Sequence, residues 1–405
     1  GRNTPQNRAL ASALDTLRGN FYGNLANVYG VLDWMGPQQL QAAFGSMVPT
    51  MAREAQMMGA LQTTTLTNIV SDRLPMLGSG AQNGRFSMIG TPGAMAVAAR
   101  QNTLGEAQMS QASFQGRLAA SNQAFGHLPE NMSGFVAMGF ETSRASLAGS
   151  GNDVRSTWHM AMGLEVEATD GLTVGSAVGF QNGQANLTSG RTDVRTGQAM
   201  AYGSYRMGGG SYVAMMGSAS FSDIGLRRNV FEVGVTNLNG QARATSAALQ
   251  AEAGVNMGLT EGLMLTPRLG LKASMNNLAG YREQGADLAM TVDTIRDRRF
   301  EARAGFALSG SQALGRSGWT LVPRLTVDHV EGLAAPSSAF VVRFAGASDV
   351  PILLPGFNQD RRWTEVRGGV SMAKGPVSLG FTVESDIGRS DFRDNRALAN
   401  FGVRF

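Results

Sequence analysis

The stretch of sequence that decides the fold runs from Leu263 to Met275 and reads LMLTPRLGLKASM. Its odd-numbered positions are all apolar, whereas its even-numbered positions include Thr266, Arg268 and Lys272. Alternate side chains of a β-strand point to opposite faces, so a strand separates these two sets and a helix cannot. The stretch therefore predicts a strand with one apolar face and one polar face.

The same alternation occurs in Phe300–Leu308 and in Val377–Ile387, and it recurs along the chain from about residue 133. Each segment that shows it is long enough to cross a bilayer at a tilt, which takes about 9–11 residues. Twelve candidate strands result, near 133–145, 156–169, 172–182, 193–207, 211–223, 240–257, 263–278, 298–312, 318–331, 360–373, 376–388 and 395–405.

The connections between these strands alternate between short and long. Tight turns are expected at Asp170-Gly171, Gly208-Gly209-Gly210, Thr260-Glu261-Gly262, Gly315-Arg316-Ser317 and Lys374-Gly375-Pro376. Longer polar loops are expected near 146–155, 183–192, 224–239, 279–297, 332–359 and 389–394. Outer-membrane barrels have short periplasmic turns and long external loops. A soluble β-sandwich would rarely need strands of this length, so we predict an all-β fold, a 12-stranded antiparallel transmembrane β-barrel.

Composition agrees with a barrel and excludes several classes of protein. Mean hydropathy is -0.10, and we find no run of 18 apolar residues of the kind that a transmembrane helix needs. A barrel hides its apolar surface in alternate positions, so its mean hydropathy stays ordinary. There are no cysteines, which excludes disulfides, cysteine metal sites and thiol catalysis. A net charge of +4 is too small to suggest nucleic-acid binding.

Charged side chains occupy the polar faces of the predicted strands. They would be costly against lipid but are expected in a wet lumen. There they would contact a helix that plugs the pore, hold a passing chain, or pair with one another and stiffen the wall. The predicted pore-lining residues are Glu141, Glu165, Glu167, Arg206, Glu252, Arg268, Lys272, Glu301, Arg303, Arg324, Asp328, Glu365, Arg367, Glu384 and Asp386.

The chain before the barrel has helical rather than strand periodicity. We divide it into a helical lead-in or passenger remnant at 1–77, a linker with a candidate helix at 78–130, and the barrel at 131–405. Gly36-Pro37 is a plausible helix start, and Pro49 should kink or divide the segment that follows. Two segments could supply a helix that fills the pore: 50–77 and 105–126.

The last strand ends at the C-terminus on an aromatic residue. Phe401, Val403 and Phe405 share one face of it. A terminal phenylalanine with alternate apolar residues resembles the signal that the outer-membrane barrel assembly machinery reads. We therefore expect these three residues to form the assembly signal.

Taken together, the strand count, the length of the barrel part and this ending resemble the β-domain of autotransporters, the type V secretion translocators. The upstream stretches 28–33, 38–44 and Ser71-Asp72-Arg73-Leu74 look like the helical lead-in that precedes such barrels. One departure is the segment 78–130, which is longer than the resemblance leads us to expect.

The resemblance implies a function and a set of partners. The barrel would let an N-terminal passenger reach the cell surface and anchor it in the bacterial outer membrane, with a helix left through the pore. The passenger would be absent or reduced to part of residues 1–35. Expected partners are outer-membrane lipids and lipopolysaccharide, whose phosphates arginine can bind bidentately, and the barrel assembly machinery. We expect a monomer that binds no nucleic acid. The chain opens Gly1-Arg2-Asn3 without a signal peptide, which suggests a fragment or a mature form.

Other functional classes remain open at this point. A passive, porin-like channel would have an open pore and no lead-in helix. A surface-binding barrel would use the loop 332–359, which is unusually apolar and could fold back as a hairpin over the mouth. An enzyme is not expected: His127, His159 and His329 lie on different elements, and no nucleophile elbow or phosphate-binding loop occurs. We expect no catalytic residue, no metal site and no cofactor.

Overall fold

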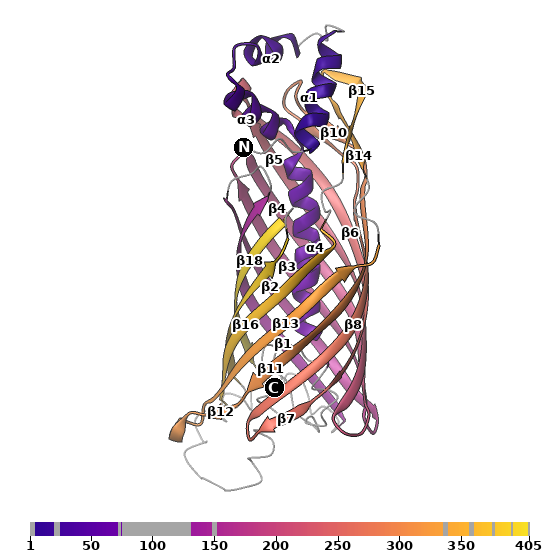
Figure 1. Cartoon of the computed structure of the whole chain (residues 1–405), viewed down its shortest axis with the longest axis vertical. Coiled ribbons are helices and arrows are strands. Elements are labelled where there is room, and N and C mark those ends of the chain that lie inside the picture. Colours follow the sequence, from indigo (N-terminus) through magenta and orange to yellow (C-terminus); the bar gives the residue numbers. More distant parts are fainter. Residues whose placement is uncertain are drawn as a thin grey trace, which may run out of the picture.

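The alternating segments form a closed antiparallel β-barrel of twelve strands in a computed structural model of the chain (Figure 1). The structure describes residues 5–19, 25–71, 74, 131–147, 152–334, 339–355, 360–374, 377–389 and 392–403. The barrel strands are β1 (Met132–Leu147), β2 (Asn152–Thr169), β3 (Leu172–Leu187), β4 (Gly190–Arg206), β5 (Ser211–Val230), β6 (Val235–Val255), β8 (Leu263–Leu278), β11 (Ile295–Gly310), β13 (Thr320–Gly332), β16 (Arg362–Lys374), β17 (Val377–Ile387) and β18 (Phe392–Val403).

Each strand pairs with the next along the chain, and β18 pairs with β1 to close the cylinder, with Leu398 opposite Glu141. Two short strands, β7 (Met257–Thr260) and β12 (Gln312–Ala313), lengthen the hairpins at one end. The predicted fold class is therefore confirmed.

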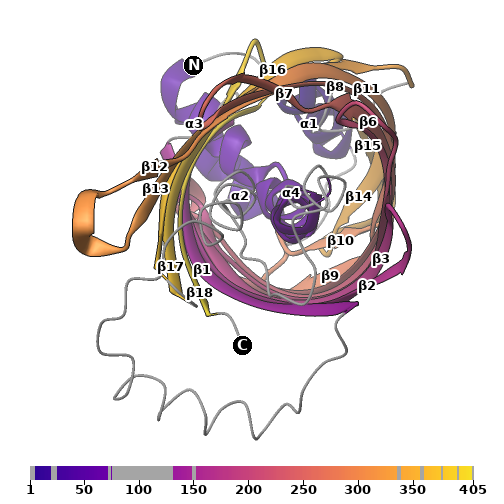
Figure 2. The same ribbon diagram turned by 90° about the horizontal axis from the view of Figure 1, so that it is seen from below.

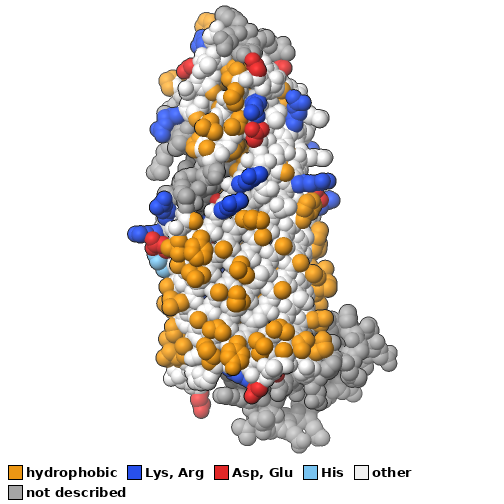
Figure 3. Space-filling model, turned by 90° about the vertical axis from the view of Figure 1, so that its right-hand side faces the viewer, with side chains coloured by type: hydrophobic (Ala, Val, Ile, Leu, Met, Phe, Trp, Pro, Cys, Tyr) orange, Lys and Arg blue, Asp and Glu red, His pale blue; other side chains and the backbone are white. Residues whose placement is uncertain are grey.

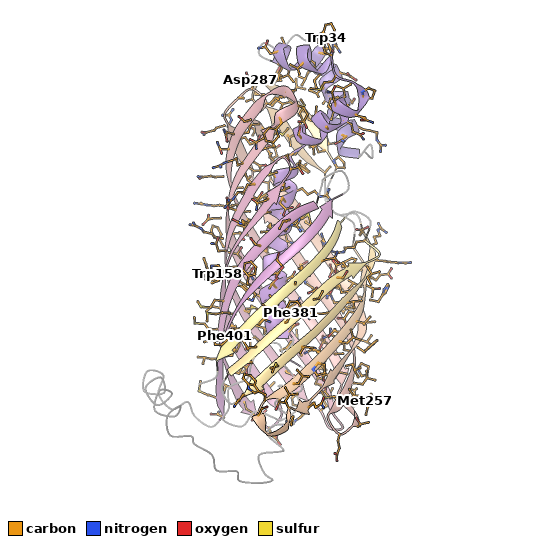
Figure 4. The ribbon with its side chains drawn as sticks, turned by 90° about the vertical axis from the view of Figure 1, so that its left-hand side faces the viewer. Trp34, Trp158, Met257, Asp287, Phe381 and Phe401 are labelled. Carbon is orange, nitrogen blue, oxygen red and sulfur yellow. The ribbon has the colours of Figure 1, made fainter. Side chains whose placement is uncertain are left out.

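The apolar face of each strand points away from the barrel. Leu269 and Leu271 of the opening stretch are 66% and 48% exposed, whereas Arg268, next to Leu269, is largely buried. Trp158, Phe381 and Phe401 lie on the outer surface of the wall (Figure 4). A belt of such side chains crosses the face of the barrel seen in Figure 3. This arrangement reverses that of a soluble protein and suits a wall that faces hydrocarbon outside and water inside.

Tight turns join the strands at one end of the barrel, called the short-turn end below. Gly171 and Gly262 have φ angles of 84° and 82°, a left-handed conformation that glycine adopts without a steric penalty. A Cβ on Gly262 would also lie 2.7 Å from the carbonyl oxygen of Ser311, so this turn requires glycine. Met257 marks this end of the barrel in Figure 4.

At the other end the predicted loops are too long, and this part of the prediction is wrong. The strands β3 and β4 continue to Leu187 and from Gly190, so a turn replaces the loop expected at 183–192. The loop expected at 224–239 shrinks to a short helical turn, η1 (Phe231–Val233). Beyond the apolar belt the outer face of a strand meets water, whereas inward residues such as Ile224, Leu226 and Val230 are buried in one apolar cluster with the N-terminal helices. The pattern of the membrane-facing segments is therefore reversed there, and the strands continue to pair.

Two further predicted loops contain strands of their own. The segment 279–297 forms β9 (Tyr281–Gln284) and β10 (Met290–Val292), followed by the start of β11. The segment 332–359 forms a hairpin of β14 (Phe340–Phe344) and β15 (Ala347–Leu354), as its apolar sequence suggested, and β14 also pairs with β10.

In the described residues before the barrel there are four helices: α1 (Pro5–Arg18), α2 (Leu25–Leu32), α3 (Pro37–Met47) and α4 (Thr50–Ser71). Helix α3 begins at Pro37 as predicted, where the backbone N–H of Gly36 donates to the side chain of Gln39 at 3.1 Å. Pro49 separates α3 from α4, as expected of a residue that cannot continue the hydrogen-bond ladder. None of the helices in the described ranges is long and apolar enough to cross a membrane.

Helix α4 lies inside the barrel (Figures 1 and 2). The other candidate for this place, 105–126, lies outside the described residues.

Helices α1 to α3, here called the helical cap, cover the end of the barrel opposite the short turns (Figure 1). Their apolar side chains share one core with the extended strands. Leu10, Leu14 and Leu17 of α1 belong to the same buried cluster as Phe344 and Ile352 of the hairpin. The sequence reading missed this core because it treated the apolar segments of 279–297 and 332–359 as loops.

Candidate functional site

A buried ion pair fixes α4 to the barrel wall. The guanidinium of Arg155 on β2 donates to both carboxylate oxygens of Glu54 on α4, and the Nη2–Oε2 distance is 2.7 Å. The two side chains are 3% and 0% exposed. Two parallel charge-assisted hydrogen bonds fix the orientation of both partners. The pair therefore sets the depth and the rotation of the helix in the lumen.

Further along α4, three threonines make polar contacts with the wall. The Thr65 hydroxyl donates to Glu141 on β1 at 2.9 Å, and the amide of Gln198 on β4 donates to the Thr67 hydroxyl at 3.1 Å. The hydroxyls of Thr63 and Ser220 lie 2.9 Å apart. Threonine satisfies wall polar groups without a large side chain, so the helix backbone can approach the wall closely.

Small residues on the same side bring α4 against the wall. A Cβ built on Gly179 of β3 would lie 2.7 Å from Leu66, so only glycine fits there without a shift. Leu66 and Val70 belong to a buried apolar cluster with Phe135 and Met200 near the short-turn end. The C-terminal part of α4 therefore packs against apolar wall residues, and its N-terminal part is fixed by the ion pair of Glu54.

The opposite side of the lumen carries a network of ion pairs within the wall. Arg303 on β11 pairs with Glu301 at 3.2 Å and with Glu365 on β16 at 2.9 Å. Elsewhere Arg268 on β8 donates from Nε to Asp328 at 3.0 Å, and Arg396 on β18 pairs with Glu384 at 2.6 Å. The bonds of Arg303 to Glu365 and of Arg268 to Asp328 each span an intervening strand, and that of Arg396 joins neighbours, so together they stiffen the cylinder.

Another buried charge cluster joins the helical cap to the extended strands. Arg228 on β5 pairs with Glu283 on β9 at 2.6 Å and donates to the carbonyl of Ser46 on α3 at 3.1 Å. The neighbouring Tyr281 is buried, and burial together with the Glu283 carboxylate raises the pKa of its phenol. The phenol therefore stays neutral and packs in the cap core.

Most of the predicted pore-lining residues are buried or half-buried on the lumen side of the wall, but few of them touch α4. Glu141 bonds to α4, whereas Glu165 and Glu252 accept hydrogen bonds from the wall residues Tyr202 and Tyr212. The other predicted residues belong to ion pairs within the wall or line the spaces beside α4: Arg268, Lys272, Glu301, Arg303, Arg324, Asp328, Glu365, Arg367, Glu384 and Asp386. Glu167 and Arg206 lie at the short-turn end, where Arg206 pairs with Asp170 at 3.3 Å.

Sequence reasoning missed the residues that hold the helix most firmly. Arg155 and Glu165 are an even number of residues apart on one strand, so their side chains point to the same face. Starting the predicted strand before residue 156 would therefore have included Arg155. Glu54 carries no comparable signal, because a single acid on a helix usually faces solvent.

The proposed assembly signal is described only in part. Phe401 on β18 points outward, is 40% exposed and pairs with Met138 of β1. The side chain of Val403 and the whole of Phe405 lie outside the described residues.

The two histidines in the described residues lie on different strands. His159 is buried on β2, and His329 on β13 contacts Thr364 at 3.3 Å. In the described part of the chain, no group of three or more His, Cys, Asp or Glu could hold a metal ion. His127 lies outside the described residues.

Three solved autotransporter barrels are among the structures that this chain resembles. The translocator domain of the autotransporter NalP from Neisseria meningitidis matches with a TM-score of 0.53 at 14% identity, over 73% of this chain and 95% of that one. The β-domain of the Bordetella autotransporter BrkA matches with a TM-score of 0.47 at 16% identity, over 67% and 98%. The transport unit of AIDA-I from Escherichia coli gives 0.47 at 13% identity, over 74% and 100%.

No curated protein matched the sequence. The family model described as "Autotransporter beta-domain" matches residues 132–384, which is more than half of the chain. The barrel with a helix in its lumen therefore belongs to the autotransporter β-domain family, and its place is the bacterial outer membrane.

Proposed function

We propose that this chain exports an N-terminal passenger through the outer membrane and anchors it at the cell surface, with α4 as the part of the exported chain that stays in the pore. The path of the chain carries the proposal. The helical cap lies at one end of the barrel, α4 runs through the lumen, and the short turns lie at the other end (Figure 1). Short turns are periplasmic in outer-membrane barrels, so the cap is external and the chain passes through the membrane as α4 before it forms the strands of the barrel.

A porin-like role is less well supported. An open pore is its defining feature, whereas here a helix of 22 residues occupies the lumen and is fixed by a buried ion pair. The fixed helix supports an anchor that keeps an exported chain attached.

We further propose that the barrel binds phosphate groups of outer-leaflet lipopolysaccharide. Arg195 of β4, Arg243 of β6, and Arg296 and Arg298 of β11 are exposed on the outward face of the wall. Arg298 lies opposite Met275, a member of the apolar belt. Basic side chains gather just beyond the belt on this face (Figure 3). They lie where phosphates of the outer leaflet would meet the wall.

Replacing Arg195, Arg296 and Arg298 with glutamine should weaken binding of phosphorylated lipid A to the detergent-solubilised protein. We expect about fivefold for each arginine, since an anionic membrane surface gives each basic residue ~1 kcal/mol. Dephosphorylated lipid A should bind equally to both proteins. The control is Arg362→Gln, which removes an exposed arginine that is paired with Glu331. Equal binding of phosphorylated lipid A to the triple variant would refute this contact.

The main test follows the N-terminal segment in living cells. An epitope tag placed before residue 5, behind a signal peptide, should be detected by antibody on intact cells, because the cap is external. Removing Phe405 should abolish most of this surface signal, because we propose that the barrel assembly machinery reads the Phe401–Phe405 ending. A tag that is reached only after the cells are permeabilised would overturn the export proposal. A surface signal that survives loss of Phe405 would overturn only the assembly signal.

A further inference from the structure

Above the apolar belt, the outward face of the strands β3 to β6 and β9 becomes polar. The belt ends on β3 and β5 at Phe180 and Phe221, which are 42% and 46% exposed. Strand pairing arranges the exposed side chains beyond them in rows that cross the strands. The highest complete row, taken from β3 to β9, consists of Asn186, Arg191, Arg227, Asn239 and Gln284. Neighbouring strands lie about 4.8 Å apart, so this row spans about 19 Å.

The next row toward the membrane contains an open glycine and another arginine. Gly225 of β5 lies opposite Asp193 of β4 and Gln241 of β6. A Cβ built on Gly225 would meet no atom within 4 Å, so the surface is open above it. Arg282 of β9 is two residues from Gln284 and shares its exposed face. These two rows together are called the upper rows below.

The upper rows have a surplus of positive charge. Their exposed charged side chains are Arg191, Arg227 and Arg282 against Asp193, and Arg191 already binds Asp193 at 2.6 Å. Arg227 and Arg282 form no ion pair or hydrogen bond with the residues that the structure describes. Both guanidinium groups can therefore bind an anion that comes from outside the chain.

Acids next to these arginines in sequence are engaged elsewhere. Glu283 follows Arg282 but points to the opposite face, where it is buried and pairs with Arg228. Glu232 of η1 accepts a hydrogen bond from the hydroxyl of Ser46 on α3. Neither carboxylate faces outward to neutralise the upper rows.

Amide side chains lie beside the two arginines. Asn239, Gln241 and Gln284 are exposed, and amides can both donate to and accept from sugar hydroxyls. Arginine binds phosphate and carboxylate groups through two parallel hydrogen bonds. Arginines separated by amides therefore match an acidic oligosaccharide, in which anionic groups are separated by hydroxyls.

The height of the upper rows above the membrane selects one acidic oligosaccharide. The highest row is four residues along each strand from Arg195 and Arg243, which lie at the level proposed above for lipid phosphates. Four residues are about 13 Å along a strand, or about 10 Å along the membrane normal for a strand tilt of about 40°. The sugars attached directly to lipid A, the inner core, occupy this layer and carry phosphate and carboxylate groups. The upper rows face sideways into it.

We infer that the upper rows bind the acidic inner-core sugars of lipopolysaccharide, with Arg227 and Arg282 on their anionic groups and a sugar ring over Gly225. The inference deepens the lipid contact proposed above and rests on the same orientation of the barrel. One lipopolysaccharide molecule is then held at two heights, by its lipid A phosphates and by its core. A phospholipid, which has no such core, cannot make the upper contact.

The test compares two ligands of the detergent-solubilised protein: phosphorylated lipid A, and deep-rough lipopolysaccharide, in which lipid A carries only the inner core. Arg227→Gln combined with Arg282→Gln should weaken binding of the core-bearing ligand about 25-fold, at about fivefold for each arginine. Binding of lipid A should not change. Gly225→Tyr, which adds bulk without charge, should also weaken binding of the core-bearing ligand alone.

Two matched controls separate these effects from general changes in charge or fold. Arg8→Gln combined with Arg362→Gln removes two exposed arginines outside the upper rows. Gly197→Tyr adds the same bulk at an open glycine between Phe180 and Phe221 of the belt. Both controls should bind the core-bearing ligand as the unmodified chain does.

Three results would overturn the inference. The first is core binding that survives the double variant of Arg227 and Arg282, and the second is an equal loss of lipid A binding in that variant. The third is tighter binding of heparin than of the core-bearing ligand, which would assign the upper rows to a soluble polysaccharide. Failure of the lipid A contact itself appears separately, as equal binding of phosphorylated lipid A to the triple variant described above.

Discussion

Replacing Glu54 with alanine is expected to release α4 from its seat in the lumen. The change leaves the Arg155 guanidinium buried without its carboxylate, because both side chains of the pair are almost completely inaccessible. Breaking a buried pair by removing one partner costs about 3–5 kcal/mol. The population with α4 released should therefore rise by a factor on the order of 10² to 10⁴. Hydrogen exchange of the α4 amides in the detergent-solubilised protein measures this directly.

The control for this prediction is an ion pair of similar geometry on the surface. Arg18 and Asp33 of the helical cap are 2.6 Å apart, but their side chains are 56% and 44% exposed. Asp33→Ala should therefore cost less than about 1 kcal/mol and leave the α4 amides protected.

A double variant, Glu54→Met with Arg155→Met, separates the cost of an orphaned charge from the value of the pair. Burying two apolar groups of similar size is often neutral or stabilising. Protection of α4 should then return to near the unmodified level. Exchange rates in Glu54→Ala that match those of the unmodified chain would show that the pair does not hold the helix.

The wall of the barrel could be predicted from sequence because lipid imposes a strict alternation on it. Leu269 and Leu271 meet hydrocarbon, Arg268 and Lys272 meet water, and the period of two follows from strand geometry. The hydrocarbon that imposes this pattern ends at the edge of the bilayer. Beyond it, Thr188 and Ser189 looked like part of a loop, although they form only the turn between two long strands.

The helix and its contacts could be predicted only in outline. Pro37 and Pro49 mark the start of α3 and the break before α4, because proline acts locally on the backbone. The partner of Glu54 depends on which strand the folded barrel brings to it, and Arg155 is 101 residues away in sequence. The close approach of α4 to the wall depends in turn on glycine at Gly179 and on three threonines, none of which carries a recognisable motif.

Removing residues 1–71 is expected to raise the single-channel conductance of the barrel by about an order of magnitude, because an α-helix with its side chains is about 10–12 Å wide and fills most of the lumen. The space left beside α4 amounts to cavities of about 120 and 50 Å³. The polar wall residues Glu141, Arg155 and Gln198 would then meet water in place of α4. Conductance recordings on the purified barrel in planar bilayers measure the change.

Deleting only residues 1–36 gives the matched control, because it removes α1 and α2 and keeps α4 in place. Its conductance should stay close to that of the full chain. If the cap rather than the helix limited flow, this shorter deletion would already produce the full increase. If neither deletion changed the conductance, the lumen would have to close around the missing helix. The strand pairing that joins β18 to β1 opposes such a collapse, since a closed cylinder of twelve paired strands cannot narrow without breaking backbone hydrogen bonds.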